Sequence, residues 1–311
     1  MNRWWERQQV GTEATGYLAL PVAGAASTAP GYDAESPPRM GFFTDTSVCI
    51  GCKACEVACK EWNGLPADLG GMSGASYDNA GALNATTWRH VAFIEQPTPA
   101  TEFDITQLAA ANFAGAVPDA HDGFRWLMAS DVCKHCTTAG CLDVCPTGAI
   151  FKTEFETVVI QPDICNGCGY CVVGCPYGVV TRREDDGRAW KCTLCYDRLQ
   201  VGEQPACAKA CPTDSINFGA YDAMQAMAHE RLDQVVEAGV TQARIYGDPT
   251  GDGRGVDGTG SLFLLLDEPE VYGLPPDPVV TTKDIGSVWQ SVGVAAVLFV
   301  GLVGAAFGRR R

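Results

Sequence analysis

The chain has 311 residues, of which 46% are hydrophobic, enough to build one large or two medium domains. Its 22 Lys and Arg face 37 Asp and Glu, so the formal net charge at pH 7 is −15. A phosphate-binding surface carries the opposite charge, and we therefore expect no nucleic-acid partner.

Sixteen cysteines stand in four groups of four, with none left over. Residues 49–59 and 165–175 have the spacing C-x2-C-x2-C-x3-C that is typical of bacterial ferredoxins. The middle gap widens to four residues in the group at 133–145 and to eleven in the group at 192–211. Proline follows the last cysteine in three groups, where it ends a short helix. The spacing predicts four [4Fe-4S] clusters, each ligated by four thiolates.

Zinc and disulfides are the alternative uses of so many cysteines. Zinc sites combine two C-x2-C pairs and have no use for a third closely spaced cysteine. Disulfides are typical of exported proteins, whereas the apolar stretch at 17–26 is short, is interrupted by Pro21 and follows no Arg-Arg pair. Both alternatives are disfavoured, and we expect any export to depend on a partner.

Two cysteine groups form one contiguous block, and the other two flank it, which indicates a duplicated module inserted into its own copy. We predict an α+β fold of two nested ferredoxin-like modules, with small antiparallel strands within 151–160 and 215–218. In chain order, the predicted parts are an extended N-terminal arm (1–40), the first half of the outer module with a partner-contacting insertion (41–130), the inner module (131–180), the second half of the outer module (181–220), an α/β C-terminal extension and stalk (221–287), a transmembrane helix (288–307) and a basic tail (308–311).

The C-terminal extension begins with a predicted helix at 221–238 that ends before Gly239. Its buried face is predicted from the spacing of five apolar residues, Met224, Met227, Leu232, Val235 and Val236. A strand is predicted at 242–246. The glycine-rich segment 248–260 matches neither a calcium loop nor a phosphate loop, so we expect a flexible linker there.

Residues 288–307 carry no charge. At a rise of about 1.5 Å per residue they are long enough to cross a hydrocarbon layer of roughly 30 Å. A buried core helix is the alternative, but a proline-rich stretch precedes the segment and three arginines follow it. These arginines, against a single Lys283 before the helix, predict a cytoplasmic C-terminus and an extracytoplasmic cluster domain.

Together these features resemble the iron-sulfur (beta) subunit of membrane-bound formate dehydrogenases, within the four-cluster subunits of molybdopterin oxidoreductases. The resemblance runs from about residue 41 onward and rests on FFTDTSVCIGCKACEVACKEWN, SYDNAGALNATTW, KCTLCYDRL and the C-terminal helix. The cysteine plan indicates the wider family, whereas 61–63 (Glu-Trp-Asn) and 77–79 (Tyr-Asp-Asn) narrow it to formate dehydrogenase. Plain packing of Trp62 and turn formation by the asparagines remain the simpler explanations of these residues.

The resemblance implies a crossed ligation, in which the last cysteine of each group joins the cluster of another group. The implied sets are Cys49, Cys52, Cys55 and Cys211 (first set); Cys59, Cys192, Cys195 and Cys207 (second set); Cys133, Cys136, Cys141 and Cys175 (third set); and Cys145, Cys165, Cys168 and Cys171 (fourth set). His135 either hydrogen-bonds a cluster sulfur or lies at the surface. Trp190 and Tyr196 are expected to shield a cluster.

The function that the resemblance implies is electron transfer without substrate chemistry in this chain. A molybdopterin alpha subunit holding molybdenum or tungsten would oxidise formate beside the first cluster. A cytochrome b gamma subunit in the lipid bilayer would receive the electrons from the last cluster and reduce quinone. The alternatives are the same role in a hydrogenase or in a thiosulfate, polysulfide or dimethyl sulfoxide reductase, and a membrane-tethered redox sensor or scaffold.

Overall fold

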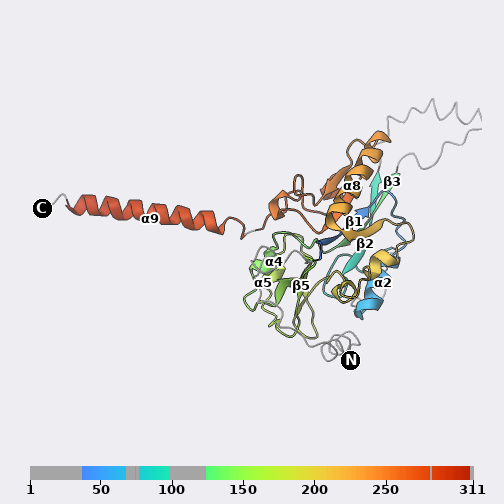
Figure 1. The fold of residues 1–311 in the computed structure, drawn as a ribbon, viewed down its shortest axis with the longest axis horizontal. Coiled ribbons are helices and arrows are strands. Elements are labelled where there is room, and N and C mark those ends of the chain that lie inside the picture. Colours follow the sequence, from blue (N-terminus) through green and yellow to red (C-terminus); the bar gives the residue numbers. More distant parts are fainter. Residues whose placement is uncertain (1–36, 68–73, 75–76, 98–123, 281, 309–311) are drawn as a thin grey trace, which may run out of the picture.

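The computed structural model describes residues 37–67, 74, 77–97, 124–280 and 282–308. These residues form a body of small sheets and short helices, from which one long helix projects (Figure 1). The predicted N-terminal arm up to residue 36, the part of the insertion at 98–123 and the arginines at 309–311 lie outside the described residues.

The body contains a four-stranded sheet with the strand order β8-β1-β10-β9, in which β1 from the N-terminal part of the described chain lies between strands from its C-terminal part. Its strands are β1 (Met40–Asp45), β8 (Ile216–Ala220), β9 (Arg244–Tyr246) and β10 (Ser261–Leu265). The strand predicted at 215–218 is confirmed as β8, and the one predicted at 242–246 begins two residues later as β9. β8 pairs antiparallel with β1, as predicted for small antiparallel strands, whereas β1 and β10 are parallel, with Phe42 opposite Ser261. The long chain segment between them supplies the crossover that parallel neighbours need.

Helix α8 (Tyr221–Glu237) covers one face of this sheet (Figure 1). Met224, Ala228 and Val235 are buried on it against Phe43, Leu262 and Leu264. The predicted helix is confirmed, and Gly239 beyond its end has the positive φ of +102° that a helix terminus favours. Met227 and Val236, predicted on the buried face, are instead 41% and 38% exposed, because only the narrow stripe through Ala228 meets the sheet.

The opposite face of the sheet packs on the cysteine-bearing loops. Side chains alternate along a strand, so Phe42 points to the cysteine side while Phe43 points to α8. Phe42, Phe263 and Leu265 share one buried core with cysteines from all four groups. This face of the sheet therefore packs directly against the cysteine loops.

Short helices carry the cysteine loops: α2 (Ala54–Asn63), α4 (Gly140–Asp143), α5 (Tyr170–Val173), α6 (Tyr196–Leu199) and α7 (Ala206–Lys209). Two antiparallel hairpins lie among them, β4 (Ile150–Lys152) with β5 (Val158–Ile160), and β6 (Thr181–Arg182) with β7 (Ala189–Trp190). The strands predicted within 151–160 are thus confirmed. As expected, α4, α5 and α7 each end before a Cys-Pro pair.

The described part of the predicted insertion contains a long antiparallel ribbon of β2 (Arg89–Pro97) and β3 (Phe124–Val132). Arg89, at the start of β2, lies opposite Val132, at the end of β3 and directly before Cys133. The ribbon therefore ends among the cysteine loops.

Segment 248–260, predicted as a flexible linker, is packed against the cysteine loop that begins at Cys133. Backbone hydrogen bonds join Thr137 N to Gly258 O at 2.9 Å and Gly260 N to His135 O at 3.0 Å. A short 3-10 helix, η1 (Arg254–Val256), buries Val256 completely. The prediction was wrong because glycines here permit tight turns close to another backbone.

The body continues through the 3-10 helix η2 (Pro269–Tyr272) into α9 (Ile285–Gly308), which points away from it (Figure 1). Over 285–305 the helix has a mean hydropathy of 1.9, and none of its most apolar stretch is buried. It is the one helix among the described residues that is long and apolar enough to cross a membrane. A buried core helix, the alternative considered for this segment, is not what the structure contains.

Candidate metal centres

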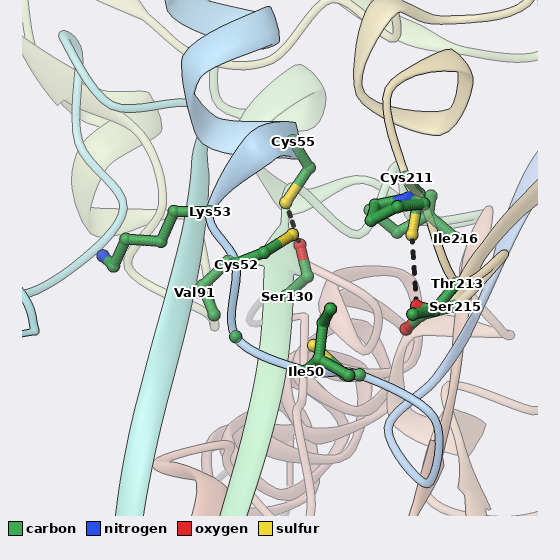
Figure 2. A pocket seen from close by; sticks show the side chains of 13 residues that line it. Ile50, Cys52, Lys53, Cys55, Val91, Ser130, Cys211, Thr213, Ser215 and Ile216 are labelled. Carbon is green, nitrogen blue, oxygen red and sulfur yellow. Dashed lines mark hydrogen bonds between the residues drawn. The ribbon is translucent and has the colours of Figure 1, made fainter.

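The first cysteine set surrounds a cavity at the start of α2. Cys49, Cys52 and Cys55 come from the loop between β1 and α2, and Cys211 comes from the turn after α7. Figure 2 shows Cys52, Cys55 and Cys211 around this space, with Lys53 pointing away from it. The fold therefore brings together cysteines from two groups that are far apart in sequence.

The third set surrounds a second cavity. Cys133, Cys136 and Cys141 belong to one group, and Cys175 closes the cavity from the next group. His135 and Lys191 also line it.

The other two sets are brought together in the same crossed manner. Burial raises the pKa of Cys59 well above its usual value, and the neighbouring Cys192, Cys207 and Cys195 raise it further. Burial raises the pKa of Cys171 to about 11, with contributions from Cys165, Cys145 and Cys168. The cysteines that affect each of these thiols are thus the other members of its predicted set.

Neighbouring sets also lie close to one another, and they do so in one order. The pKa of Cys207 in the second set is raised by burial and also by Cys55 of the first. Burial and Cys133 of the third set raise the pKa of Cys192 in the second to about 12. Burial is the main cause that raises the pKa of Cys141 in the third set to about 12, and Cys171 of the fourth adds to it. The four sets therefore form a row, from first to fourth.

Exposure differs along this row. All four cysteines of the second set are buried, whereas Cys52 in the first set and Cys168 in the fourth are exposed. The two ends of the row thus reach the surface, and its second position does not.

Thiolates in this arrangement suit iron-sulfur clusters. All sixteen cysteines are free, and soft sulfur ligands select such clusters among the common metal groups. Burial raises the pKa of several of these thiols, among them Cys59, Cys136 and Cys192. Those thiols ionise only with a compensating positive charge, which a metal cluster supplies. Among the described residues, no three His, Cys, Asp or Glu side chains converge closely enough to hold a single ion. Cavities lined by four thiols fit a larger polynuclear group.

Several polar groups hydrogen-bond the cysteine sulfurs. Ser130 Oγ lies 3.1 Å from Cys55 Sγ, as Figure 2 shows. The Leu194 backbone N–H donates to Cys192 Sγ at 3.3 Å, and Asn63 Nδ2 lies 3.7 Å from Cys59 Sγ. A ligated thiolate only accepts, so these contacts would stabilise its negative charge and tune the cluster potential.

His135 is buried, with 2% of its surface exposed, so the surface position considered for it is wrong. Its Nδ1 accepts a hydrogen bond from the Val158 backbone N–H at 3.1 Å. Burial, with Lys191 and Arg39 nearby, lowers its pKa well below the usual value, and the ring is therefore neutral. Nε2 carries the proton and has no hydrogen-bond partner in the described part of the chain. A bond from Nε2 to a cluster sulfur stays a prediction.

The two predicted shielding residues differ in burial. Trp190 is 6% exposed, belongs to the core shared with the cysteines and stacks on Trp88 with ring centroids 6.4 Å apart. Tyr196 is only partly buried, and its hydroxyl donates to Glu154 Oε2 at 2.9 Å. Of the two, Trp190 therefore has the position that shielding requires.

Comparison with known proteins agrees with this geometry. Models of a 4Fe-4S dicluster domain match residues 48–149 and 124–221. The formate dehydrogenase iron-sulfur subunit of Haemophilus influenzae is 38% identical over 264 residues, which are 83% of this chain and 75% of that protein. The chain belongs to the family of formate dehydrogenase iron-sulfur subunits.

Other relatives place this family member in its wider group. The formate dehydrogenase-O iron-sulfur subunit of Escherichia coli is 38% identical over 81% of this chain and 78% of its own length. A subunit of the anaerobic dimethyl sulfoxide reductase of Escherichia coli is 32% identical over 60% of this chain and 76% of its own length. The chain is thus an iron-sulfur electron-transfer subunit of the formate dehydrogenase or dimethyl sulfoxide reductase type.

Two buried cations among the cysteines of this family member were not predicted from sequence. Arg89 is 1% exposed and Lys191 is 2% exposed. Lys191 Nζ donates to the carbonyls of Val158 and Cys192, and the Cys192 bond is 3.0 Å long. The position of Lys191 directly before Cys192 is a weak indication in the sequence that this lysine lies among the cysteines. Arg89 lies far from any cysteine in sequence, so the sequence gives no such indication for it.

Proposed function

We propose that this chain binds four [4Fe-4S] clusters in the four predicted cysteine sets and conducts electrons along them in the order first to fourth. The observation that carries the proposal is the row of sets, linked through Cys55 and Cys207, Cys192 and Cys133, and Cys141 and Cys171. A bound cluster of this type takes up and releases one electron. The protein holds the thiolates in place, excludes water and supplies hydrogen bonds to sulfur.

The exposed ends of the row favour separate entry and exit points. Cys52 marks the end at the first set, where a molybdopterin subunit containing molybdenum or tungsten would deliver electrons. Cys168 marks the end at the fourth set, where a membrane cytochrome b would receive them and pass them to quinone. The stalk before α9 supports this direction, since Thr282 Oγ1 donates to Asp143 Oδ2 at 2.6 Å. Asp143 lies on α4, between Cys141 of the third set and Cys145 of the fourth.

Formate is the proposed electron source because the iron-sulfur subunits of formate dehydrogenases match most of this chain. The dimethyl sulfoxide reductase relative keeps the same role with another catalytic subunit as the second candidate. A sensor or scaffold is disfavoured, since sensing needs one labile cluster and the second set is wholly buried.

Purification of the intact complex tests this function. We expect at least about sixteen iron and at least about sixteen acid-labile sulfide per copy of this chain, since the haem of the cytochrome b partner adds further iron, with spectra of interacting reduced [4Fe-4S] centres. The complex should reduce a viologen dye with formate. Dye reduction with hydrogen but not with formate would exclude the formate assignment, and stoichiometric zinc would exclude the clusters.

A Cys168→Ser variant of the complex tests the exit point. We expect formate to reduce the dye at a normal rate, because the catalytic subunit and the first cluster are intact, while quinone reduction falls at least tenfold. Quinone reduction at the normal rate in a variant that has lost the fourth cluster signal would place the exit elsewhere.

We further propose that α9 spans the membrane, with the cluster domain on the extracytoplasmic side. Protease added to intact spheroplasts should cut the cluster domain and leave the C-terminus protected. The reverse pattern would place the cluster domain in the cytoplasm.

A further inference from the structure

Arg89 is a buried guanidinium whose hydrogen-bonding capacity is unused. It opens β2 with 1% of its surface exposed, and its Nε and both terminal nitrogens have no hydrogen-bond partner among the described residues. Its guanidinium contacts the Phe42 ring, whose centroid lies 5.1 Å from Cζ. A buried charge without hydrogen bonds is costly, and one cation–π contact offsets only part of that cost. Nearby negative charge would stabilise this buried guanidinium, and neutral thiol side chains do not supply it.

The groups around Arg89 are cysteines from two different sets. Burial lowers the pKa of Arg89, but Cys207, Cys55, Cys192 and Cys59 raise it by more, so the guanidinium stays charged. Cys55 belongs to the first set, and the other three belong to the second. In return Arg89 lowers the pKa of Cys207 and of Cys59, although burial keeps both above their usual values. The cation thus faces the junction between the first and second sets.

We propose that Arg89 is a positioning residue that raises the reduction potentials of the first two clusters together. The inference rests on the proposed ligation of the first and second sets. Reduction adds one electron, and hence one negative charge, to a cluster. A fixed positive charge in a low-dielectric interior favours that state. The guanidinium keeps its proton throughout, so no proton accompanies the electron.

Because one cation lies near both clusters, it affects the electron-transfer step between them. Both potentials move in the same direction, so the driving force between the first and second clusters changes only by the difference between the two shifts. Electrons delivered at the first set would then meet an acceptor pair that is easier to reduce than cysteine ligation alone would make it.

The test is an EPR-monitored redox titration of the intact complex. Arg89→Gln removes the charge, Arg89→Lys keeps it, and Arg183→Gln is the matched control. Arg183 is also buried, but it stacks on Trp190 at 3.9 Å and donates to Ala85 O at 3.3 Å, so its guanidinium already has partners.

In Arg89→Gln we expect two of the four EPR components to become harder to reduce. At a fixed ambient potential the ratio of reduced to oxidised cluster should fall at least tenfold for both, a shift of about 59 mV for a one-electron couple. The other two components should stay in place. Arg89→Lys should restore most of the shift, and Arg183→Gln should leave the first two components unchanged.

A fully loaded Arg89→Gln complex with four unchanged components, or with all four shifted equally, would overturn the proposal. If Arg89→Gln fails to load iron, Arg89→Lys decides the question. Normal loading and potentials in the lysine variant support a role for charge, whereas failure of both variants would show that only the shape of the arginine matters. A wild-type complex without [4Fe-4S] signals would instead refute the proposed function itself.

Discussion

Asp248 is a buried charge whose carboxylate oxygens are fully engaged in hydrogen bonds, in contrast to the Arg89 guanidinium. The residue is 3% exposed. Its Oδ1 accepts from the Thr250 backbone N–H and hydroxyl at 2.8 and 2.5 Å, and its Oδ2 accepts from Gln225 and His229, each at 3.0 Å. Burial alone would raise the pKa of Asp248, but these hydrogen bonds outweigh it and lower the pKa to about 2. The carboxylate thereby ties segment 248–260 to α8.

Replacing this carboxylate should loosen the wall of the third cysteine set. We expect Asp248→Asn to lower the free energy of unfolding by about 1–3 kcal/mol, because buried donors lose their charged acceptor. Anaerobic thermal unfolding at a fixed scan rate would measure the change. Asp257→Asn is the control, since that carboxylate, 49% exposed, pairs with Lys283 at the surface, where such a pair contributes about 0–1 kcal/mol.

The pH dependence of this effect has a definite sign. The folded-state pKa of Asp248, about 2, lies below the ordinary value of 3.8. Its contribution to stability is therefore complete above about pH 5 and is lost only as the pH falls towards 2. The difference between wild type and Asp248→Asn should be equal at pH 7 and pH 6. A difference that shrinks over this interval would contradict the assigned pKa.

At the scale of elements, the short helices α4 and α5 pack closely against each other where the third and fourth sets meet. A Cβ added to Gly140, the first residue of α4, would lie 2.5 Å from the Gly174 carbonyl oxygen, at the end of α5, and 3.3 Å from Val280. The neighbouring Cys141 and Cys175 share the second cavity. Only glycine lets the two helices approach this closely.

Gly140→Ala should therefore disturb the inner module. The added methyl group meets backbone that cannot rotate away, and such overpacking costs about 1–3 kcal/mol. We expect less iron per chain and weaker EPR signals from the third and fourth clusters. Gly251→Ala is the control, because its Cβ would meet nothing within 4 Å. Equal iron content in the two variants would show that α4 and α5 tolerate separation.

A second regularity at this scale is a pair of Trp–cation dipeptides. Trp88 and Trp190 stack on each other, and each is followed by a buried cation, Arg89 or Lys191. Arg89 faces the first and second sets. Lys191 lies near Cys133, Cys141 and Cys175 of the third set and Cys192 of the second. β2 and β7 thus place one cation at each of the first two junctions of the row.

For the whole molecule, the row of sets runs through the body to the side from which α9 emerges. The stalk before α9 is anchored there, with Val280 1% exposed against α4. The side chains of α9 are exposed along its length, among them Val297 near its centre at 73%. A surface this apolar on a projecting helix indicates contact with lipid or with another apolar helix.

A charge at the centre of α9 should weaken membrane association. In Val297→Arg we expect more of the complex in the soluble fraction after lysis, since arginine at mid-membrane costs about 2.5–3.5 kcal/mol. Dye-linked formate oxidation should persist while quinone reduction falls. Val297→Leu keeps the apolar surface and should behave as wild type. If the two variants fractionate alike, α9 does not anchor the protein.

The cysteine chemistry and the element types could be read from the sequence, because both depend on local spacing. Three thiols within seven residues suit a cluster in any fold, a Cys-Pro pair ends a helix wherever it occurs, and α8 and α9 follow from short-range apolar patterns. Properties that depend on distant neighbours could not be read in this way. The stripe of α8 that is buried, the parallel pairing of β1 with β10 and the packing of 248–260 are set by segments far away in the chain.

The same distinction between local patterns and distant contacts applies to the cysteine sets. Spacing indicated the four groups of cysteines, because that pattern lies within each group, and the family resemblance implied the crossed sets that join them. Only the tertiary structure decided the order of the sets, the exposure of Cys52 and Cys168, and the burial of His135. It alone placed the Arg89 guanidinium between two cysteine sets, because the strand that carries it lies far from them in sequence and meets them only in the folded chain.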